Sequence, residues 1–467
     1  MKVRISESTF ELVRRCIRES FVLGMRSPET GCILLVNTNL HPENPSIVVR
    51  DVIVPDGDDF DDRSSGHLTF SAQFLRSIVL RTRRDGNDGF ITVHTHPFSG
   101  DTVQFSPYDD DSDPGLMKNL VDQVPDGLFG SIVAGKNSFQ GRIWSAADLR
   151  FRQLSDLVVV GQRIDLWPLT GGKKPEAPVA ASIFDRAMTL TNARSLSTLS
   201  KMRLAVVGNS GTGSLVAEAL VRAGVGELFL FDFDFADVTN LNRVLHLRTS
   251  DAEKNVRKSD RLKEALDEIG MPAKIKVVRG GDIREAAVAA ELRGCDAIFG
   301  CVDNSDWARL VMSEVAYQYL IPYIDVGTEI GVGKQGIQSL DSRVSISGPD
   351  RACLACSNII DYERVRLEGL APDELQRVMA MGYTASRPLN APAVMDLNMR
   401  AASYGVLVLR HLLQPFLEEP LPAHFKEALT TFSTRKLQAI ASEDCPICGR
   451  DGRLGAADRR SLTVRAH

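Results

Sequence analysis

The segment LAVVGNSGTGS, residues 204–214, constrains the fold more than any other stretch of this 467-residue chain. A short apolar run precedes glycines at positions 208, 211 and 213, and the helical pattern SLVAEALVRAGV follows them. A strand that passes through glycines into a helix directs backbone N–H groups and a helix N-terminus toward phosphate oxygens. We therefore predict that Gly208, Gly211 and Gly213 line a bound nucleotide.

Strands and helices alternate after residue 183. Further short apolar runs occur in ELFLFDFD at 227–234, CDAIFGCVDN at 295–304 and PYIDVGTEIG at 322–331. This alternation predicts a parallel sheet built from βαβ units, a Rossmann-like α/β domain. Residues 395–413 read as an apolar helix, and its two arginines argue against a membrane span. We expect that helix to pack in the core or in a dimer interface.

The residues behind the second strand of this domain narrow its function. A dinucleotide-binding dehydrogenase would show the same glycines, with Asp232 holding a ribose hydroxyl. Beyond Asp232 the chain carries Asp234, Asn240, Asn242, Arg243 and Lys258. A triphosphate needs such cations, whereas a nicotinamide cofactor has less use for them. Asp303, at the end of a later strand, can then hold Mg²⁺ or the adenylate end of ATP.

The first part of the chain, residues 1–167, has a different pattern. It reads as an α+β unit with a helix at 10–23 and strands at 31–36, 46–55, 89–96 and 127–135. Residues 168–182, PLTGGKKPEAPVAAS, concentrate proline, glycine and charge, which is typical of a linker. We place the second domain at 183–450 and a C-terminal tail at 451–467.

Two histidines in the first domain indicate a metal site. His94 and His96 are separated by one residue, so in a strand both side chains point to the same face. A catalytic zinc takes three protein ligands and leaves one position for water. Asp109 can supply the third ligand, although Asp110 and Asp111 compete for that role. A pair of histidines without metal is the competing interpretation.

Two further side chains would complete a hydrolytic site. Ser106, three residues before Asp109, can donate a hydrogen bond to the oxyanion that forms when a carbonyl is attacked. Glu29, just before a strand, is a candidate general base that passes the water proton to the leaving amine.

The eight cysteines include two Cys-x-x-Cys pairs. These pairs are Cys353 with Cys356 and Cys445 with Cys448. Four thiolates satisfy a closed tetrahedral zinc site, which we favour over a redox role in a reducing compartment.

The first fifteen residues lack the apolar core of a secretory signal, so we expect a cytoplasmic protein. A net charge of -5 gives no general attraction to nucleic acid or membrane.

The order Glu, His-x-His-Pro, Ser-x-x-Asp in the first domain resembles the JAMM (JAB/MPN) metallo-isopeptidases. The resemblance implies zinc ligands His94, His96 and Asp109, with Glu29 as acid/base and Ser106 as oxyanion partner. It also implies cleavage after the C-terminal glycine of a ubiquitin-like protein.

The second domain resembles the ThiF-type fold of ubiquitin-activating enzymes and of enzymes that adenylate sulfur-carrier proteins. The resemblance implies ATP with Mg²⁺, glycines 208, 211 and 213 along the nucleotide, and Asp232 and Asp234 behind the second strand. Asn240, Arg243 and Lys258 would handle phosphates, and Asp303 would complete the site. Ser210 replaces a glycine that the family usually carries. Arg186 would reach into the partner subunit, which implies a homodimer. The resemblance also implies that the four paired cysteines hold a structural zinc.

An acyl-accepting cysteine is missing, because none occurs between Ser357 and Asp444. Direct transfer to another protein or a sulfur donor, an ester on Tyr383, Thr384 or Ser386, and loss of a cysteine all remain open. A good electrophile such as an acyl-adenylate can react even with a weak hydroxyl nucleophile.

We therefore expect a two-domain, bacterial-type enzyme that trims or deconjugates a ubiquitin-like protein and activates its carboxylate by adenylation. Such fusions resemble components of prokaryotic ubiquitin-like conjugation operons, some tied to phage defence, with a conjugating enzyme as a further partner. The first alternative is trimming and adenylation of a sulfur-carrier protein for thiocarboxylate formation. The second is a non-catalytic scaffold that binds a nucleotide and a peptide tail.

Overall fold

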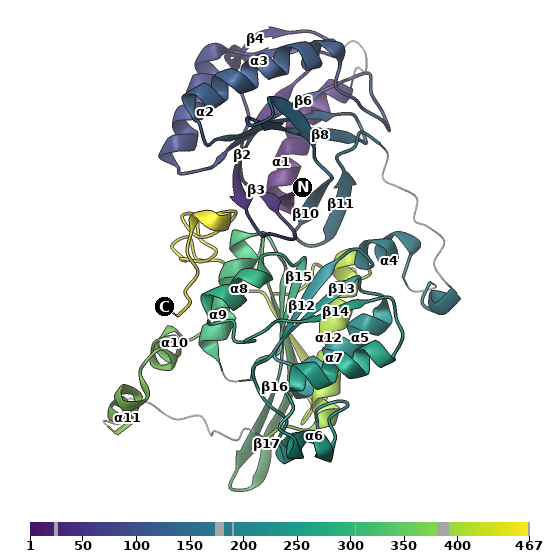
Figure 1. The fold of residues 1–467 in the computed structure, drawn as a ribbon, viewed down its shortest axis with the longest axis vertical. Helices are drawn as coiled ribbons and strands as arrows, with labels where there is room; N and C mark the ends of the chain where they lie inside the picture. Colours follow the sequence, from purple (N-terminus) through teal and green to yellow (C-terminus); the bar gives the residue numbers. More distant parts are fainter. Residues whose placement is uncertain (23–26, 173–181, 189–190, 304, 381–391, 466–467) are drawn as a thin grey trace. The chain divides into compact units, whose positions relative to one another are not determined.

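The computed structural model describes the chain apart from residues 23–26, 173–181, 189–190, 304, 381–391 and 466–467 (Figure 1). The chain divides into two compact units. The first contains Met1–Ala177, Gln318–Leu320 and Arg453–Ser461. The second contains Pro178–Tyr317, Ile321–Gly452 and Leu462–His467. The division between them falls inside the segment predicted as a linker.

The first unit is built on a nine-stranded sheet in the order β11-β10-β1-β3-β2-β6-β7-β8-β9. Its strands are β1 (Lys2–Ser6), β2 (Gly31–Asn39), β3 (Ser46–Ile53), β6 (Gly89–Thr95), β7 (Leu128–Ala134), β8 (Phe139–Ser145), β9 (Arg150–Gln153), β10 (Asp156–Val160) and β11 (Ile164–Pro168). Its helices are α1 (Glu7–Arg18), α2 (Ala72–Arg84) and α3 (Pro107–Gln123). A separate hairpin pairs β4 (Phe60–Arg63) with β5 (Leu68–Phe70).

Both faces of this sheet are buried, and β2 shows why. Successive side chains of a strand point to opposite faces. Leu34 of β2 joins the core that packs against α1, which includes Phe10. Ile33 and Leu35 join the core on the other face, which includes Phe74 of α2. A strand buried on both sides reads as a continuous apolar run, as GCILLV does.

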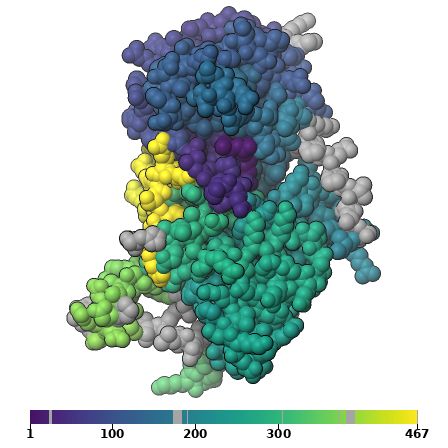
Figure 2. Space-filling view, viewed as in Figure 1, coloured from purple at the N-terminus to yellow at the C-terminus, as the bar shows by residue number. Residues whose placement is uncertain are grey.

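The C-terminal tail predicted at 451–467 is divided between the units, with Arg453–Ser461 in the first. The Nδ2 atom of Asn37 donates to the Gly455 carbonyl at 2.9 Å, and the Leu40 N–H donates to Asp458 at 2.8 Å. In Figure 2 these C-terminal residues, coloured yellow, lie beside the purple N-terminal residues of the same unit. The first unit is therefore completed by chain from both ends of the sequence.

The second unit has an eight-stranded sheet in the order β14-β13-β12-β15-β16-β17-β18-β19. Its strands are β12 (Arg203–Val207), β13 (Glu227–Phe231), β14 (Lys274–Val277), β15 (Ala297–Gly300), β16 (Tyr323–Gly333), β17 (Gly336–Ser347), β18 (His424–Ala428) and β19 (Ser433–Leu437). Neighbouring strands from β14 to β16 in this order are parallel. Strands β17, β18 and β19 then each pair antiparallel with the strand before them.

The helices of the second unit connect and cover this sheet (Figure 1). They are α4 (Ala193–Leu199), α5 (Gly211–Ala223), α6 (Thr249–Glu253), α7 (Lys258–Glu268), α8 (Ala286–Leu292), α9 (Asp306–Gln318), α10 (Tyr362–Glu368), α11 (Pro372–Ala380) and α12 (Met395–Leu413). Helix α12 has the bounds predicted from sequence and packs against α5, β16 and β17. Among the helices of the described residues, none is long and apolar enough to cross a membrane.

Candidate functional site

The glycine segment lies where strand β12 meets helix α5. Gly208 follows β12 with a φ of +86°, a conformation that side chains with a Cβ rarely adopt. A Cβ on Gly213 would lie 1.7 Å from the Gly208 carbonyl oxygen. Ser210 stands at the N-cap of α5 and its side chain makes no capping hydrogen bond. The local sequence therefore builds a tight turn whose backbone can approach a phosphate closely.

Asp232, at the end of β13, lies beside this turn. Its carboxylate accepts hydrogen bonds from the backbone N–H groups of Asn209 at 2.6 Å and Asp234 at 2.8 Å. Burial raises the pKa of Asp232, while these two N–H donors lower it part of the way. Backbone N–H groups from the turn after β12 and from the segment after β13 thus hold the Asp232 carboxylate, as an acceptor for ribose hydroxyls would be held.

Two of the predicted phosphate-binding residues are connected to this turn, Lys258 through Asp234 and Arg243 through Gly211. Lys258, only 7% exposed, begins helix α7, and its Nζ lies 3.0 Å from the Asp234 carboxylate. Arg243 donates to the Thr239 carbonyl at 2.5 Å, and its Cγ lies 3.4 Å from the position of a Cβ on Gly211. Asn240 is buried, and its Oδ1 has no hydrogen-bond partner among the described residues.

Asp303 follows β15 and is held by a neighbour that the sequence did not single out. Arg309 of α9 donates to the carbonyl oxygens of Val302 at 2.7 Å and Asp303 at 3.4 Å. The same guanidinium contacts the buried carboxylate of Asp325 at 3.2 Å. Burial raises the pKa of Asp303, and the charges of Arg243, Arg309 and Lys258 lower it part of the way. Arg309 thus fixes the loop that presents Asp303.

A cavity of about 270 Å³ lies at this turn, and the predicted phosphate-binding residues Asn240, Arg243 and Lys258 are not among the residues that line it. Gly208, Asp232, Asp234 and Asp303 line it. It is also lined by Gly281, Asp282 and Arg284, which sequence reasoning missed. A Cβ on Gly281 would lie 2.3 Å from the Asp232 carbonyl oxygen, and its φ is +68°. The Gly-Gly-Asp sequence at 280–282, which follows strand β14, was the signal that could have identified this wall.

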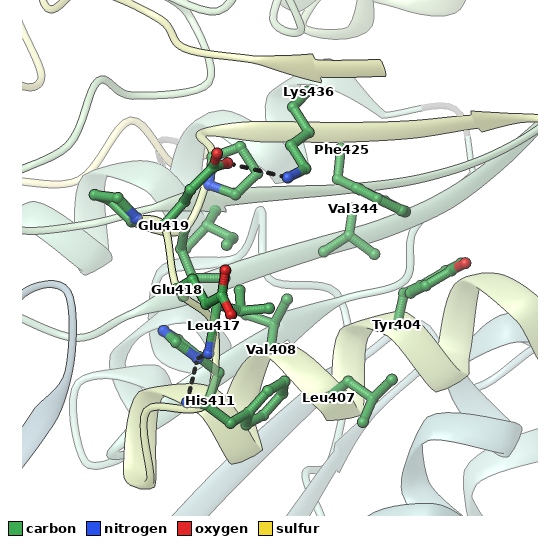
Figure 3. A pocket seen from close by; sticks show the side chains of 15 residues that line it. Val344, Tyr404, Leu407, Val408, His411, Leu417, Glu418, Glu419, Phe425 and Lys436 are labelled. Atoms are coloured by element: carbon green, nitrogen blue, oxygen red, sulfur yellow. Dashed lines mark hydrogen bonds and ion pairs between the residues drawn. The ribbon is translucent and has the colours of Figure 1, made fainter. Parts of the chain in front are cut away.

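A larger cavity of about 520 Å³ lies elsewhere in the second unit. Figure 3 shows Tyr404, Leu407 and Val408 of α12 facing it, with the ion pair between Glu419 and Lys436 at one side. None of the predicted site residues lines it. Its walls are mainly apolar, and Lys436 at its side is paired with Glu419, so it does not offer the cluster of cations that a triphosphate requires.

Arg186 is exposed on a turn well away from the glycine segment within this chain. Nearby Phe184 packs against Gly224, at the C-terminal end of α5. Gly211 starts the same helix of 13 residues at its other end. A role in a partner subunit remains a prediction. The predicted ester acceptors Tyr383, Thr384 and Ser386 lie outside the described residues.

In the first unit, one ligand atom each of Glu29, His94 and His96 lies within 4.8 Å of the others. Asp109 is close to both histidines, with its carboxylate oxygens 3.3 Å from each Nε2 atom. Glu29 Oε1 and His94 Nε2 are buried without a hydrogen-bond partner among the described residues. Unpartnered ligand-type atoms that converge in this way fit a zinc ion.

The charges of this cluster are strongly coupled. Burial raises the pKa of Glu29, although His94 and His96 lower it part of the way. Burial lowers the pKa of His94, but the neighbouring Asp109 and Glu29 carboxylates raise it, and the net shift is upward. Burial opposes ionisation of Asp109, yet both histidines and the Ser106 backbone bring its pKa well below the usual range.

The structure separates the three adjacent aspartates by what they contact. Asp110 forms an ion pair with Arg142, and Asp111 is exposed. Arg142 also donates to the Asp109 carbonyl at 3.0 Å. Only Asp109 of the three lies against the histidines in the recorded contacts of the described residues.

Ser106 has a structural role in addition to the predicted catalytic one. It is the N-cap of α3, where its Oγ donates to Asp109 Oδ2 at 2.8 Å and accepts from the Asp109 N–H at 3.2 Å. The Asp109 carboxylate in turn accepts from the Ser106 N–H, which completes a capping box. The Ser-x-x-Asp spacing thus orients the Asp109 carboxylate toward the histidines.

The two Cys-x-x-Cys pairs meet in the second unit, although 92 residues separate their members. The Sγ atoms of Cys353 and Cys445 are 3.5 Å apart, and those of Cys356 and Cys448 are 3.6 Å apart. One Sγ atom from each of the four lies within 4.8 Å of the others. The Ser442 N–H contacts the Cys356 sulfur at 3.5 Å. Four converging sulfurs with an N–H donor fit a structural zinc.

Comparison with known proteins gives matches of different extent. A model described as "ThiF family" matches residues 184–443. "Ubiquitin-like modifier-activating enzyme 5" of Oryza sativa subsp. japonica is 26% identical over 196 residues, 38% of this chain and 44% of that protein. "tRNA threonylcarbamoyladenosine dehydratase" of Bacillus subtilis (strain 168) is 46% identical over 63 residues, 14% of this chain and 25% of that protein.

Among solved structures, E. coli MccB matches with a TM-score of 0.46 and 16% identity, over 62% of this chain and 76% of that chain. The chain spans less than half the length of the rice relative and a quarter of the Bacillus relative.

Proposed function

Because the chain belongs to the ThiF family, we propose that its second unit uses ATP and Mg²⁺ to adenylate the C-terminal carboxylate of a ubiquitin-like protein. The name of the rice relative, a ubiquitin-like modifier-activating enzyme, supports this class of partner. A carboxylate oxygen attacks the α-phosphorus, the bond from that phosphorus to the β-phosphate oxygen breaks, and pyrophosphate leaves. The products are an acyl-adenylate and pyrophosphate.

One observation carries this proposal: buried Lys258 is held by Asp234, which lines one cavity together with Gly208 of the glycine turn and Asp303. A buried cation next to a helix N-terminus stabilises the charge that develops on the phosphates. Asp303 would hold Mg²⁺, and Asp232 the ribose. Arg186 would serve the site of a second copy, which makes the active form a homodimer.

The test is exchange of labelled pyrophosphate into ATP, which depends on reversible adenylate formation. Purified chain, ATP and a candidate partner that ends in glycine should support exchange. Lys258→Ala should reduce it by about a hundredfold or more, as for loss of a main electrostatic contact. Lys263→Ala, an exposed lysine on the same helix, should leave it unchanged. Equal exchange by both variants would refute the proposal.

A sulfur-carrier protein is the second candidate partner of this site. No cysteine occurs between residues 357 and 444, so a thioester on that stretch has no acceptor. Direct transfer of the acyl group from the adenylate to a sulfur donor needs no such cysteine. Mass spectrometry of the products with a sulfurtransferase, compared with a conjugating enzyme, distinguishes a thiocarboxylate from a conjugate.

For the first unit we propose zinc-dependent hydrolysis of the bond after the terminal glycine of the same kind of partner. His94, His96 and Asp109 would hold the ion, which when bound supplies a Lewis acid and a water of lowered pKa. Glu29 would accept a proton at its carboxylate and deliver it to the leaving amine, for which a raised pKa is suited. Cleavage of a glycine-extended substrate that a zinc chelator abolishes, and added zinc restores, is the test.

A further inference from the structure

Asn398, in the first turn of α12, is a buried amide that neither the sequence motifs nor the proposed chemistry uses. Only 3% of it is exposed. Its Oδ1 accepts from the hydroxyl of Thr212 at 3.3 Å and from that of Thr328 at 3.3 Å. With each hydroxyl as the donor, Oδ1 of the amide faces the two threonines and Nδ2 lies on the other branch of the side chain. The Nδ2 group is therefore the part of the side chain left to face something else.

That Nδ2 group lies against the first residue of α5. A Cβ on Gly211 would be 2.3 Å from Nδ2 and 3.4 Å from the Cγ of Arg243. Among the described residues no acceptor for Nδ2 is recorded. The absence of a side chain at Gly211 thus leaves space at the start of α5, bordered by the Asn398 amide and the Arg243 side chain.

The groups around the first turn of α5 are donors and positive charges. The first N–H groups of an α-helix lack partners in the helix, and Ser210 does not cap them through its side chain. Nδ2 is a donor, Arg243 is a cation, and the helix N-terminus carries partial positive charge. The amide Nδ2 and the helix N–H groups are donors that suit an oxyanion, and the Arg243 guanidinium, which donates to Thr239 and Asn242, adds positive charge nearby.

We propose that Asn398 Nδ2 donates a hydrogen bond to an oxyanion bound at the first turn of α5. The inference rests on the proposed adenylation and adds to it a residue of α12 that selects and orients the substrate. A phosphate oxygen of ATP and the terminal carboxylate of the partner share this chemistry. The neighbouring Arg243 favours the phosphate.

Asn398→Asp is the sharp test, because it keeps the shape and both accepted hydrogen bonds and replaces only the donor. An aspartate accepts from Thr212 and Thr328 as the amide does, but repels an anion at the Nδ2 position. Affinity for a non-hydrolysable ATP analogue, measured by calorimetry without partner protein, should fall at least about tenfold. Asn398→Ala, which removes the donor without adding charge, should lose less.

Met399→Asp is the matched control, since it adds the same charge at the next residue of α12, where the side chain is 51% exposed. It should bind the analogue as the wild type does. If Asn398→Asp keeps its affinity for the analogue but raises the KM for the partner, the oxyanion is the carboxylate. If it changes neither while its melting temperature is normal, the amide only joins the helices and the inference is wrong.

Lys258→Ala measured alongside separates this failure from failure of the proposed function. Loss of analogue binding in Lys258→Ala, with neither the analogue affinity nor the KM for the partner changed in Asn398→Asp, overturns the inference alone. Normal binding in both variants overturns the nucleotide site itself.

Discussion

Lys258 and Asp234 contact each other twice. The Lys258 ammonium lies 3.0 Å from the Asp234 carboxylate, and the Lys258 backbone N–H donates to the Asp234 carbonyl at 3.1 Å. The start of α7 and the segment after β13 are therefore joined through both main chain and side chain. The lysine is buried, while the aspartate is about half exposed. This pairing holds a cation in position before any nucleotide binds.

Asp234→Asn tests that pairing. Without the carboxylate the Lys258 ammonium keeps its charge but loses the contact that orients it, so we expect a KM for ATP about three- to tenfold higher. The maximal exchange rate should change less than the KM. Asp267→Asn, which removes an equivalent partner from exposed Lys263 on the same helix, should change neither. A purely structural role would instead lower the melting temperature and leave the KM unchanged.

Gly213→Ala should abolish nucleotide binding through a steric clash alone, because the substitution changes no charge. The new Cβ would stand 1.7 Å from the Gly208 carbonyl oxygen, so the turn between β12 and α5 must open. Such overpacking typically costs about 1–3 kcal/mol of stability. Gly57→Ala is the control, since a Cβ there has nothing within 4 Å and the residue has no positive φ. Calorimetric titration with ATP should show heat only for the control.

Local patterns anticipated much of this architecture. Helix α12 occupies the predicted residues 395–413, because an apolar period with polar breaks specifies a helix without reference to neighbours. Gly213 is explained by nearby sequence, since a Cβ there would meet the Gly208 carbonyl oxygen, whereas a Cβ on Gly208 would lie 2.7 Å from the distant Cys301 carbonyl oxygen. The start of α5 was expected later than Gly211, because glycines rarely begin a helix by propensity alone.

Contacts between distant residues could not be anticipated in the same way. Asn398 meets Thr212 across 186 residues, and nothing near Asn398 in sequence announces that contact. Arg309 was overlooked because its role depends on the carbonyl of Asp303 and on Asp325 of another strand. Sequence spacing favoured Asp109 over its neighbours, but the ion pair of Asp110 with Arg142 supplies the physical reason.

The pKa of Asp303 gives a pH prediction for the empty protein. Burial raises this pKa, so in the window from the unfolded to the folded pKa the folded state binds more protons. This group therefore contributes stability below the unfolded pKa that is lost as the pH rises through the folded value. Asp303→Asn should be more stable relative to wild type at about pH 7 than at about pH 4. Urea unfolding at the two pH values measures the difference.

The same residue also sets an acid limit on activity. Asp303 must be ionised to hold Mg²⁺, so exchange should fail at a higher pH than for an ordinary carboxylate. Arg243 has the largest lowering influence on this pKa, and Arg243→Ala should move the acid limb of the residual rate to higher pH. An acid limb that stays in place in this variant would contradict the assignment.

Zinc content tests the four-cysteine cluster. Cys445→Ser should lose the zinc of the second unit and lower the melting temperature, because the three remaining thiols cannot close the tetrahedral site that holds the ion. Cys295→Ser, a buried cysteine outside the cluster, should keep its metal content. Mass spectrometry of native protein would show loss of one ion in the first variant. Retention of all bound zinc there would rule out the cluster as a metal site.

Asp109→Asn and Asp111→Asn form a matched pair in the first unit. Asp109 touches both histidines, whereas Asp111 is exposed two residues later on the same helix. Asp109→Asn should lower zinc affinity by about tenfold or more and reduce cleavage after the terminal glycine accordingly. Asp111→Asn should retain both the zinc affinity and the cleavage.

Glu29→Gln should keep the zinc and lose cleavage by about a hundredfold, because the amide cannot accept the proton. Normal cleavage by Glu29→Gln, or equal zinc loss in the two aspartate variants, would contradict the hydrolytic assignment.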